Sequence, residues 1–252
     1  MHRSTEAIAH DLHRDGFAVL PFDAAVAAWA DAARVAALRV LSENTERRHG
    51  GTWFVGVDAL PNAEDGSIGD VPLAGAWRHH VTTPRVWHRA QLSVVFPGYP
   101  QQDPDESDTA YRFRRDRDAA HIDGLLPEGP SKRRHLREPH GFILGVPLND
   151  VSASPLVVWP GSHHLIHTAF ARAFASCHPD TWPDQDVTEI YQDVRRLVFA
   201  ECRRVAVRAQ PGEAIVLHRH LVHGVAPWGD SNERRPRMVA YFRPLVPFAD
   251  WL

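Results

Sequence analysis

The stretch His121-Ile122-Asp123 constrains the fold of this chain more than any other feature of its sequence. Its histidine and aspartate are two residues apart, so on a β-strand both side chains would point to the same face. Two imidazoles and one carboxylate, with three coordination positions left open, are the ligand set of mononuclear non-haem Fe(II) sites. The third ligand is then a distant histidine, and His223, which follows an apolar run, fits this role. A fold that forms this site must bring two distant segments together.

Other histidines compete with this interpretation, because the chain has 17 of them. His218 and His220 lie close to His223, and strand periodicity cannot decide which of the three binds if a turn intervenes. The pairs His79-His80 and His163-His164 would place successive side chains on opposite faces of an extended strand, where they are poor chelates. We predict that these pairs lie at the surface or beside a ligand.

Several further motifs accompany the candidate ligands. They are Asp15 to Leu20, the Trp-Pro-Gly-Ser-His sequence at 159–163, Gly212-Glu213, His223-Gly224 and an Arg-Pro-Arg sequence at 235–237. In this order, and with His121-Ile122-Asp123, they resemble the phytanoyl-CoA dioxygenase family, which includes ectoine hydroxylase, from about residue 6 to residue 244. The resemblance implies an enzyme that depends on Fe(II), 2-oxoglutarate and O2. It also implies that His121, Asp123 and His223 are its catalytic metal ligands.

The same resemblance implies an arginine, after the distal histidine, that binds the C5 carboxylate of 2-oxoglutarate. Arginine suits this role because its planar fork makes paired bonds to a carboxylate and keeps its charge. The candidates are Arg234, Arg235 and Arg237. In the family, this arginine lies shortly after the distal histidine and directly before a strand. Here the loop 225–236 is about three residues longer than in the family, so the distance from His223 favours Arg234, whereas the position directly before a strand favours Arg237. We predict Arg237, because a loop absorbs an insertion more easily than a strand does.

The resemblance also bears on the reaction. It places Gln91, which opens an apolar stretch, toward the cosubstrate or the substrate. Asp123 argues against halogenation, because halogenating relatives have a small residue at that position. The expected reaction is hydroxylation of a small molecule with release of succinate and CO2. Two other classes stay open: a zinc-type hydrolase, which also uses three protein ligands and a water, and a barrel that binds a small ligand without turnover.

Composition limits the partners and the setting. The chain has 252 residues, of which 44% are hydrophobic, enough for one globular domain with a sizeable core. Its net charge of −3 favours neither nucleic acid nor a membrane as a partner, and the sequence gives no indication of the oligomeric state. The two cysteines show no paired spacing, which is typical of a cytoplasmic protein. The apolar segment 24–41 is interrupted by Asp31, Arg34 and Arg39, so it predicts neither a signal peptide nor a membrane span.

The pattern of apolar residues predicts helices at residues 4–14 and 24–42, capped by Ser4 or Thr5 and by Asp23. Residues 109–120 are predicted as a strand that delivers His121, residues 127–139 as a mobile basic loop, and residues 165–202 as mainly helical. Short strands are predicted at 17–22, 53–57, 90–96, 141–148, 155–159, 205–207, 214–217 and 238–242. The expected fold is mainly β with flanking helices, and the resemblance implies a double-stranded β-helix, or jelly-roll, barrel. We expect a single domain over 1–252, with lid or substrate elements at 50–84, 127–139 and 165–204.

Overall fold

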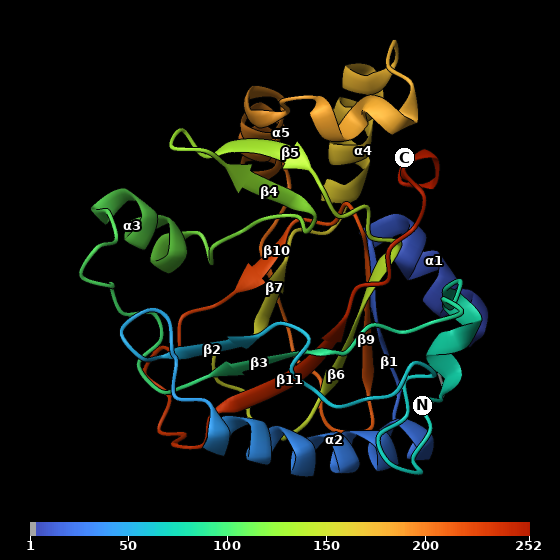
Figure 1. Cartoon of the computed structure of the whole chain (residues 1–252), viewed down its shortest axis with the longest axis vertical. Coiled ribbons are helices and arrows are strands. Elements are labelled where there is room, and N and C mark those ends of the chain that lie inside the picture. Colours follow the sequence, from blue (N-terminus) through green and yellow to red (C-terminus); the bar gives the residue numbers. More distant parts are fainter. Residues whose placement is uncertain (1–3) are drawn as a thin grey trace.

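The computed structural model describes residues 4–252 as antiparallel sheets flanked by helices (Figure 1). The strands are β1 (Phe17–Leu20), β2 (Trp53–Gly56), β3 (Gln91–Val95), β4 (Leu125–Glu128), β5 (Arg133–Leu136), β6 (Phe142–Pro147), β7 (Leu156–Val158), β8 (Val205–Val207), β9 (Ala214–His218), β10 (His223–Val225) and β11 (Arg237–Phe242). The helices are α1 (Thr5–Asp15), α2 (Ala24–Glu43), α3 (Asp108–Asp116), α4 (Ser162–Phe174) and α5 (Thr188–Glu201), with 3-10 turns η1 (Ala76–His80), η2 (Pro179–Asp184) and η3 (Phe248–Asp250).

The strands form one large sheet, one small sheet and a hairpin. The large sheet has the order β1-β9-β6-β11-β3-β2, and the small sheet has the order β10-β7-β8. β4 and β5 form the hairpin, which lies with α4 and α5 at the upper end of the molecule in Figure 1. The predicted class, mainly antiparallel strands with flanking helices, agrees with this arrangement, although no hydrogen-bonded ladder closes the sheets into a barrel within residues 4–252.

The two faces of the large sheet bury different cores. Because side chains alternate along a strand, Met238, Ala240 and Phe242 of β11 point to one face, where α2 covers them. Trp29 of α2 is fully buried there, with its ring centroid 5.5 Å from that of Phe242. Val239 and Tyr241 point to the other face and belong to the cluster that also contains Leu156 and Val158 of the small sheet. The space between the two sheets is therefore lined by alternate residues of their strands.

The N-terminal helices begin where the sequence predicts. The Ser4 side chain accepts a hydrogen bond from the backbone N–H of Ala7 at 3.2 Å, and α1 ends at Gly16, whose φ is 79°. Asp23 caps α2 by accepting from the backbone N–H of Ala25 at 2.8 Å. The predicted strands at the positions of β1, β2, β3, β6, β7, β8, β9 and β11 are also confirmed, as is the mainly helical region that holds α4, η2 and α5.

The prediction of a strand over residues 109–120 is wrong. This segment contains α3, which begins after Ser107, and the Ser107 hydroxyl accepts from the backbone N–H of Ala110 at 3.3 Å. Tyr111 and Phe113 alternate with arginines and so imitate a strand pattern over a short window. The serine followed by Asp108 is a helix start signal that this alternation concealed.

The prediction of a mobile loop over residues 127–139 is also wrong. Leu125 pairs with Leu136, and Glu128 pairs with Arg133, so the segment forms the β4-β5 hairpin. The backbone N–H of Arg134 donates to Thr188 Oγ1 at 2.7 Å, which ties the hairpin to the start of α5. The prolines are compatible with this because Pro127 needs no donor in a two-stranded ribbon, whose outer edges are unpaired.

His163 is buried, whereas the neighbouring-pair pattern predicted a position at the surface or beside a ligand. It is only 4% exposed, in the first turn of α4, and its Nε2 donates to the backbone carbonyl of His13 at 3.0 Å. The pair His163-His164 is helical rather than extended, so the alternation of side chains along a strand does not apply to it.

Among residues 4–252, no helix is both long enough and apolar enough to cross a membrane.

Candidate metal centre

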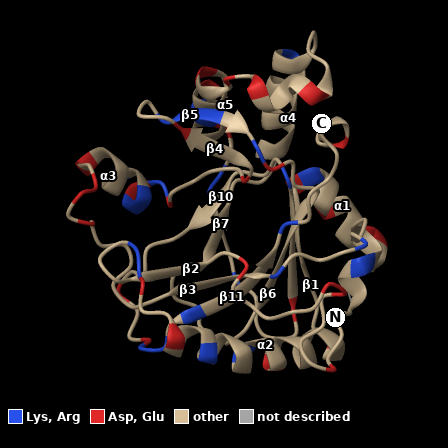
Figure 2. Cartoon of the chain, viewed as in Figure 1, with Lys and Arg blue, Asp and Glu red and all other residues tan. Residues whose placement is uncertain are grey.

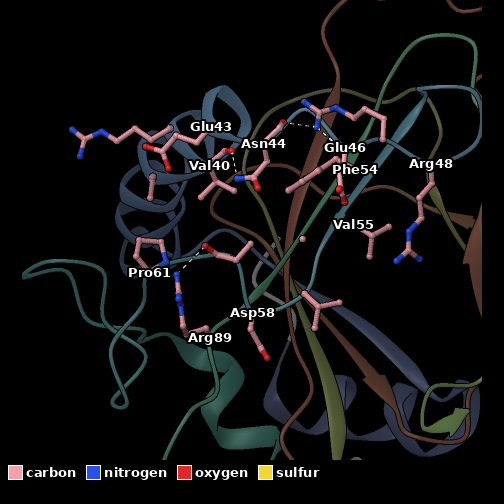
Figure 3. Close-up of a pocket in the computed structure, with 16 residues that line it drawn as sticks. Val40, Glu43, Asn44, Glu46, Arg48, Phe54, Val55, Asp58, Pro61 and Arg89 are labelled. Atoms are coloured by element: carbon pink, nitrogen blue, oxygen red, sulfur yellow. Dashed lines mark hydrogen bonds between the residues drawn. The ribbon is translucent and has the colours of Figure 1, made fainter.

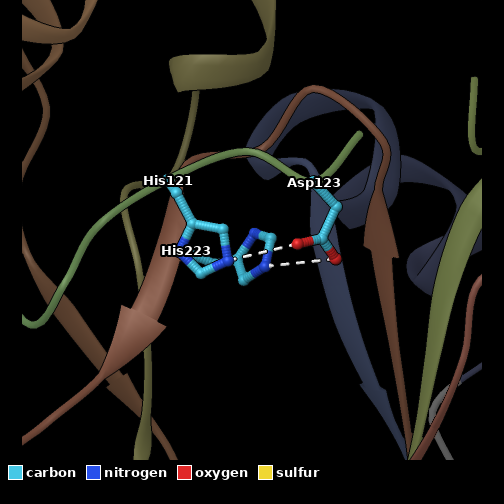
Figure 4. Close-up of side chains that lie close together, drawn as sticks. All are labelled: His121, Asp123 and His223. Carbon is cyan, nitrogen blue, oxygen red and sulfur yellow. Dashed lines mark ion pairs between the residues drawn. The ribbon is translucent and has the colours of Figure 1, made fainter. Parts of the chain in front are cut away.

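The structure brings His121, Asp123 and His223 together (Figure 4). His121 Nε2 lies 3.1 Å from Asp123 Oδ1, and His223 Nε2 lies 3.7 Å from Asp123 Oδ2. One ligand atom from each residue falls within 4.8 Å of the other two. The three side chains point toward one another, with two imidazole nitrogens and a carboxylate facing a common point.

Backbone pairing across the molecule brings the two histidines together. His121 forms an isolated bridge with His223, in which each backbone N–H donates to the other residue's carbonyl, at 2.8 and 2.9 Å. The prediction that a strand holds both His121 and Asp123 is wrong, because the chain turns at Asp123-Gly124. Gly124 has a φ of 86°, and a Cβ there would lie 2.1 Å from the carbonyl oxygen of Glu138, so the turn requires glycine.

Hydrogen bonds to backbone carbonyls fix the orientation of both imidazoles. His121 Nδ1 lies 2.9 Å from the carbonyl oxygen of Ala119, and His223 Nδ1 lies 2.9 Å from that of Leu221. Because a carbonyl oxygen can only accept, each Nδ1 must carry the proton and donate it. With Nδ1 as the donor, each ring can present the lone pair of Nε2 to the point that the Asp123 carboxylate also faces, the arrangement that metal-binding histidines require.

Arg243 is a residue of the site that the sequence analysis missed. It follows β11, and its guanidinium pairs with Asp123 Oδ2 through Nε and donates to Gln91 Oε1 through Nη1 at 3.0 Å. Burial raises the pKa of Asp123, but the charge of Arg243 and then the proximity of His223 outweigh this effect and hold that pKa well below its usual value. Asp123 is therefore a carboxylate at neutral pH, with Oδ2 held by Arg243 and Oδ1 facing His121.

Of the three neighbouring histidines, only His223 reaches the other two candidate ligands. Burial lowers the pKa of His223 to about 4, so its ring is neutral at pH 7. His218 and His220 lie beside α4 instead, and the His220 ring is 4.4 Å from that of Trp251 and fully buried. The turn at 219–220 breaks the strand alternation, and of the three histidines it leaves His223 beside His121 and Asp123.

The three side chains open into a pocket of about 760 Å³ between the sheets. Its apolar wall includes Trp53, Phe113, Leu125, Leu126, Ile143, Leu156, Leu217 and Tyr241. Gln91 also lines the pocket, opposite Tyr241 in the register of β3 and β11. A small molecule of mainly apolar character could fit beside the candidate ligands.

The predicted arginines occupy different environments. Arg237 begins β11 and is only 7% exposed, and its Nη1 is buried without a hydrogen-bond partner among residues 4–252. It shares its face of the strand with Val239 and Tyr241, and it lines a separate cavity of about 140 Å³. Arg234 is exposed, and Arg235 is exposed and pairs with Glu233 at 2.7 Å. Among the three, only Arg237 points into the space between the sheets.

A second cluster of possible metal ligands and a second hollow are less suited to bind a ligand. His49, Asp103 and Glu106 also bring ligand atoms within 4.8 Å of one another, yet Glu106 pairs with Arg114 and Asp103 accepts from the backbone N–H groups of His49 and Gly50. A hollow of about 860 Å³ lies between the end of α2 and β2, and Figure 3 shows its side chains scattered around an open space without convergence.

Comparisons with known proteins show what fold this chain shares. No family model and no curated protein matches the sequence. Among solved structures, the non-heme alpha ketoglutarate dependent carbocyclase SnoK from nogalamycin biosynthesis is 16% identical with a TM-score of 0.50, over 96% of this chain and 84% of that one. EvdMO1 is 19% identical with a TM-score of 0.50, over 94% of this chain and 49% of that one.

EctD from S. alaskensis with bound Fe is 18% identical with a TM-score of 0.48, over 98% of this chain and 80% of EctD. At such low identities, the likeness to SnoK and EvdMO1 shows the fold alone. SnoK is described as a non-heme alpha ketoglutarate dependent enzyme.

Proposed function

We propose that this protein is an Fe(II)- and 2-oxoglutarate-dependent oxygenase that hydroxylates a small molecule. The observation that carries the proposal is the convergence of His121, Asp123 and His223 in the lining of a mainly apolar pocket. The set of two histidines and one carboxylate, which leaves positions for cosubstrate and O2, is typical of this enzyme class. The shared fold with an alpha ketoglutarate-dependent carbocyclase supports the same conclusion.

The residues present fit the metal and the cosubstrate. His121 and His223 would hold Fe(II) through Nε2, because their Nδ1 protons are engaged by carbonyls, and Asp123 would supply Oδ1. The unpartnered Nη1 of Arg237 suits the C5 carboxylate of 2-oxoglutarate, since a buried donor without an acceptor is costly. A zinc-type hydrolase would leave this buried arginine without a role.

The bound metal and cosubstrate would supply the oxidising chemistry, in which O2 and 2-oxoglutarate give succinate, CO2 and a hydroxylated product. The protein's residues do the rest. Arg243 holds Oδ2 of Asp123, so only one carboxylate oxygen is free to bind. The apolar walls made by Ile143, Leu217 and Tyr241 would limit the access of water and orient the substrate.

The proposal extends to the architecture. We infer that the two facing sheets form the double-stranded β-helix of this enzyme class, within a single domain. Alternate residues of both sheets face a common interior, which supports this inference. Leu126, Pro127 and Arg134 of the β4-β5 hairpin and Arg195 of α5 line the pocket, so these segments are proposed as substrate elements.

Anaerobic titration tests the proposed function directly. Fe(II) followed by 2-oxoglutarate should give a new visible absorption band, and O2 consumption should then depend on 2-oxoglutarate. The band arises only if the cosubstrate binds the metal itself. A protein that binds a divalent ion but shows neither response would be better described as a hydrolase or a ligand-binding protein.

Removal of the Arg243 guanidinium should weaken metal binding. Arg243→Gln frees Asp123 Oδ2 and removes a donor to Gln91, so the carboxylate loses its orientation. Loss of such a partner typically lowers metal affinity about 10- to 100-fold. Anaerobic calorimetry with Fe(II) measures the effect, and Arg235→Gln, at an exposed arginine, is the matched control. Tighter binding in Arg243→Gln would mean that charge repulsion outweighs orientation.

A further inference from the structure

The pocket of the candidate metal centre carries an unbalanced positive charge on one wall. Four arginines line it, namely Arg114, Arg134, Arg195 and Arg243. Two of them are neutralised, since Arg114 pairs with Glu106 and Arg243 pairs with Asp123. Within residues 4–252, neither Arg134 nor Arg195 has a carboxylate partner. Figure 2 shows positive charge on β5, close to α5.

The acidic residues of the same pocket are engaged elsewhere. Glu138 lies 3.3 Å from His140 Nε2, and Asp58 lies 3.4 Å from His88 Nδ1. Asp123 belongs to the candidate metal centre. The carboxylates that line the pocket therefore do not neutralise the pair formed by Arg134 and Arg195.

The lack of a carboxylate partner for Arg134 is not shared by the neighbouring arginines of the same hairpin region. Arg133 pairs with Asp186 and, at 2.7 Å, with Glu189, whereas Arg137 pairs with Glu128 at 2.5 Å. These two arginines and Arg134 belong to the same hairpin region. Only Arg134 faces the pocket, and it alone lacks a carboxylate.

The two unpaired guanidinium groups are held in place. Arg134 donates through Nη1 to the carbonyl of Leu125 at 2.8 Å. The guanidinium carbon of Arg195 lies 4.6 Å from the ring centroid of Phe113 and 5.2 Å from that of Tyr191. Burial lowers the pKa of Arg134, and the nearby charge of Arg195 lowers it further. Two like charges in a half-buried wall repel each other, and an anion between them would relieve this repulsion.

We propose that Arg134 and Arg195 form an oxyanion subsite that binds a carboxylate or phosphate group on an otherwise apolar substrate. The inference rests on the proposed function for its link to catalysis. Guanidinium groups suit oxyanions because they donate in a planar fork and lose less hydration than an ammonium does. The walls made by Phe113, Leu125 and Leu126 suit an apolar body between the anion and the metal.

The subsite is connected to the candidate ligands through Tyr191. Its hydroxyl accepts from the backbone N–H of Ile122 at 3.1 Å, between His121 and Asp123. Arg195 lies over the ring of the same tyrosine and one turn further along α5. An anion held by Arg195 would therefore place the attached apolar group next to the metal-binding segment.

Binding of simple probes tests the subsite without a known substrate. The probes are 3-phenylpropionate, its neutral amide and phenyl phosphate, measured by calorimetry on the full chain with saturating 2-oxoglutarate and again without metal or 2-oxoglutarate. At least one of the two acids should bind more tightly than the amide. The acid with the higher affinity shows whether the subsite prefers a carboxylate or a phosphate. Arg134→Gln and Arg195→Gln should each weaken that acid about tenfold or more, with no change for the amide. Arg134→Lys should recover part of the loss.

Matched variants decide what the result means. Arg133→Gln and Arg137→Gln remove equal charge from arginines that already have partners, so acid binding should be unchanged. Equal affinity for acid and amide, or equal losses in all four glutamine variants, would overturn the subsite. Competition between 2-oxoglutarate and the probe would also overturn it, because the arginines would then hold the cosubstrate. Acid binding that survives without any response to Fe(II) or 2-oxoglutarate would support the subsite while refuting the oxygenase.

Discussion

Replacement of Asp123 with alanine is expected to reduce Fe(II) uptake and 2-oxoglutarate-dependent O2 consumption to background, whereas the unaltered protein should bind about one Fe(II) per chain. Asp123 is the only anionic group among the three candidate ligands, and its side chain is 13% exposed. Its loss would leave two imidazoles and the positive charge of Arg243 facing a divalent cation. Iron analysis after anaerobic loading, together with an oxygen electrode, measures both effects.

His121→Ala and His223→Ala should have the same outcome, because each removes one of the two nitrogens that face Asp123. Asp123→Asn keeps the shape of the side chain, so it separates the loss of charge from any loss of folding. His218→Ala is the control, since His218 lies beside α4 and away from the candidate ligands. Full activity in His223→Ala, with activity lost in His218→Ala or His220→Ala, would assign the third ligand differently.

The parts of the fold that the sequence predicted well depend on local chemistry. The caps at Ser4 and Asp23 act over two or three residues, so the sequence itself contains both partners of each hydrogen bond. The central strands β6 and β11 of the large sheet were visible as short apolar runs, because side chains on both of their faces are buried. The clustering of His121, Asp123 and His223 was likewise anticipated, although the position of Asp123 on a turn was not.

The features that the sequence did not predict depend on contacts between residues that are distant in the sequence. The partners of Arg243 are Asp123 and Gln91, which lie 120 and 152 residues away in the sequence, so only the sheet register brings them together. The β4-β5 hairpin contains prolines and many charges, and its pairing with the start of α5 outweighs these loop-like features. The sequence also does not show that Arg134 lacks a carboxylate partner. The adjacent Arg133 has two such partners, Asp186 and Glu189, and both are distant in the sequence.

The second large effect is expected for Arg237, whose replacement by alanine should raise the apparent requirement for 2-oxoglutarate by at least about tenfold. The side chain is only 7% exposed and its Nη1 has no partner in the described part of the chain, so a carboxylate bound there would be shielded from water. Loss of one partner of a buried charge pair typically costs about 2–5 kcal/mol, or roughly thirtyfold to several thousandfold in affinity. Arg237→Lys should recover only part of the loss, because an ammonium cannot reproduce the planar fork.

Iron content separates this role from that of the ligands. Arg237→Ala should keep nearly all of its Fe(II), since Arg237 lies on β11 and is not one of the three converging side chains. Arg234→Ala and Arg235→Ala are the matched controls, because both arginines are exposed and neither faces the space between the sheets. If Arg234→Ala weakens 2-oxoglutarate binding and Arg237→Ala does not, the carboxylate-binding arginine lies three residues earlier than predicted, and its distance from His223 decides its position rather than its place before β11. If none of the three variants changes 2-oxoglutarate binding, and Fe(II) with 2-oxoglutarate gives no new absorption, the oxygenase proposal should be abandoned.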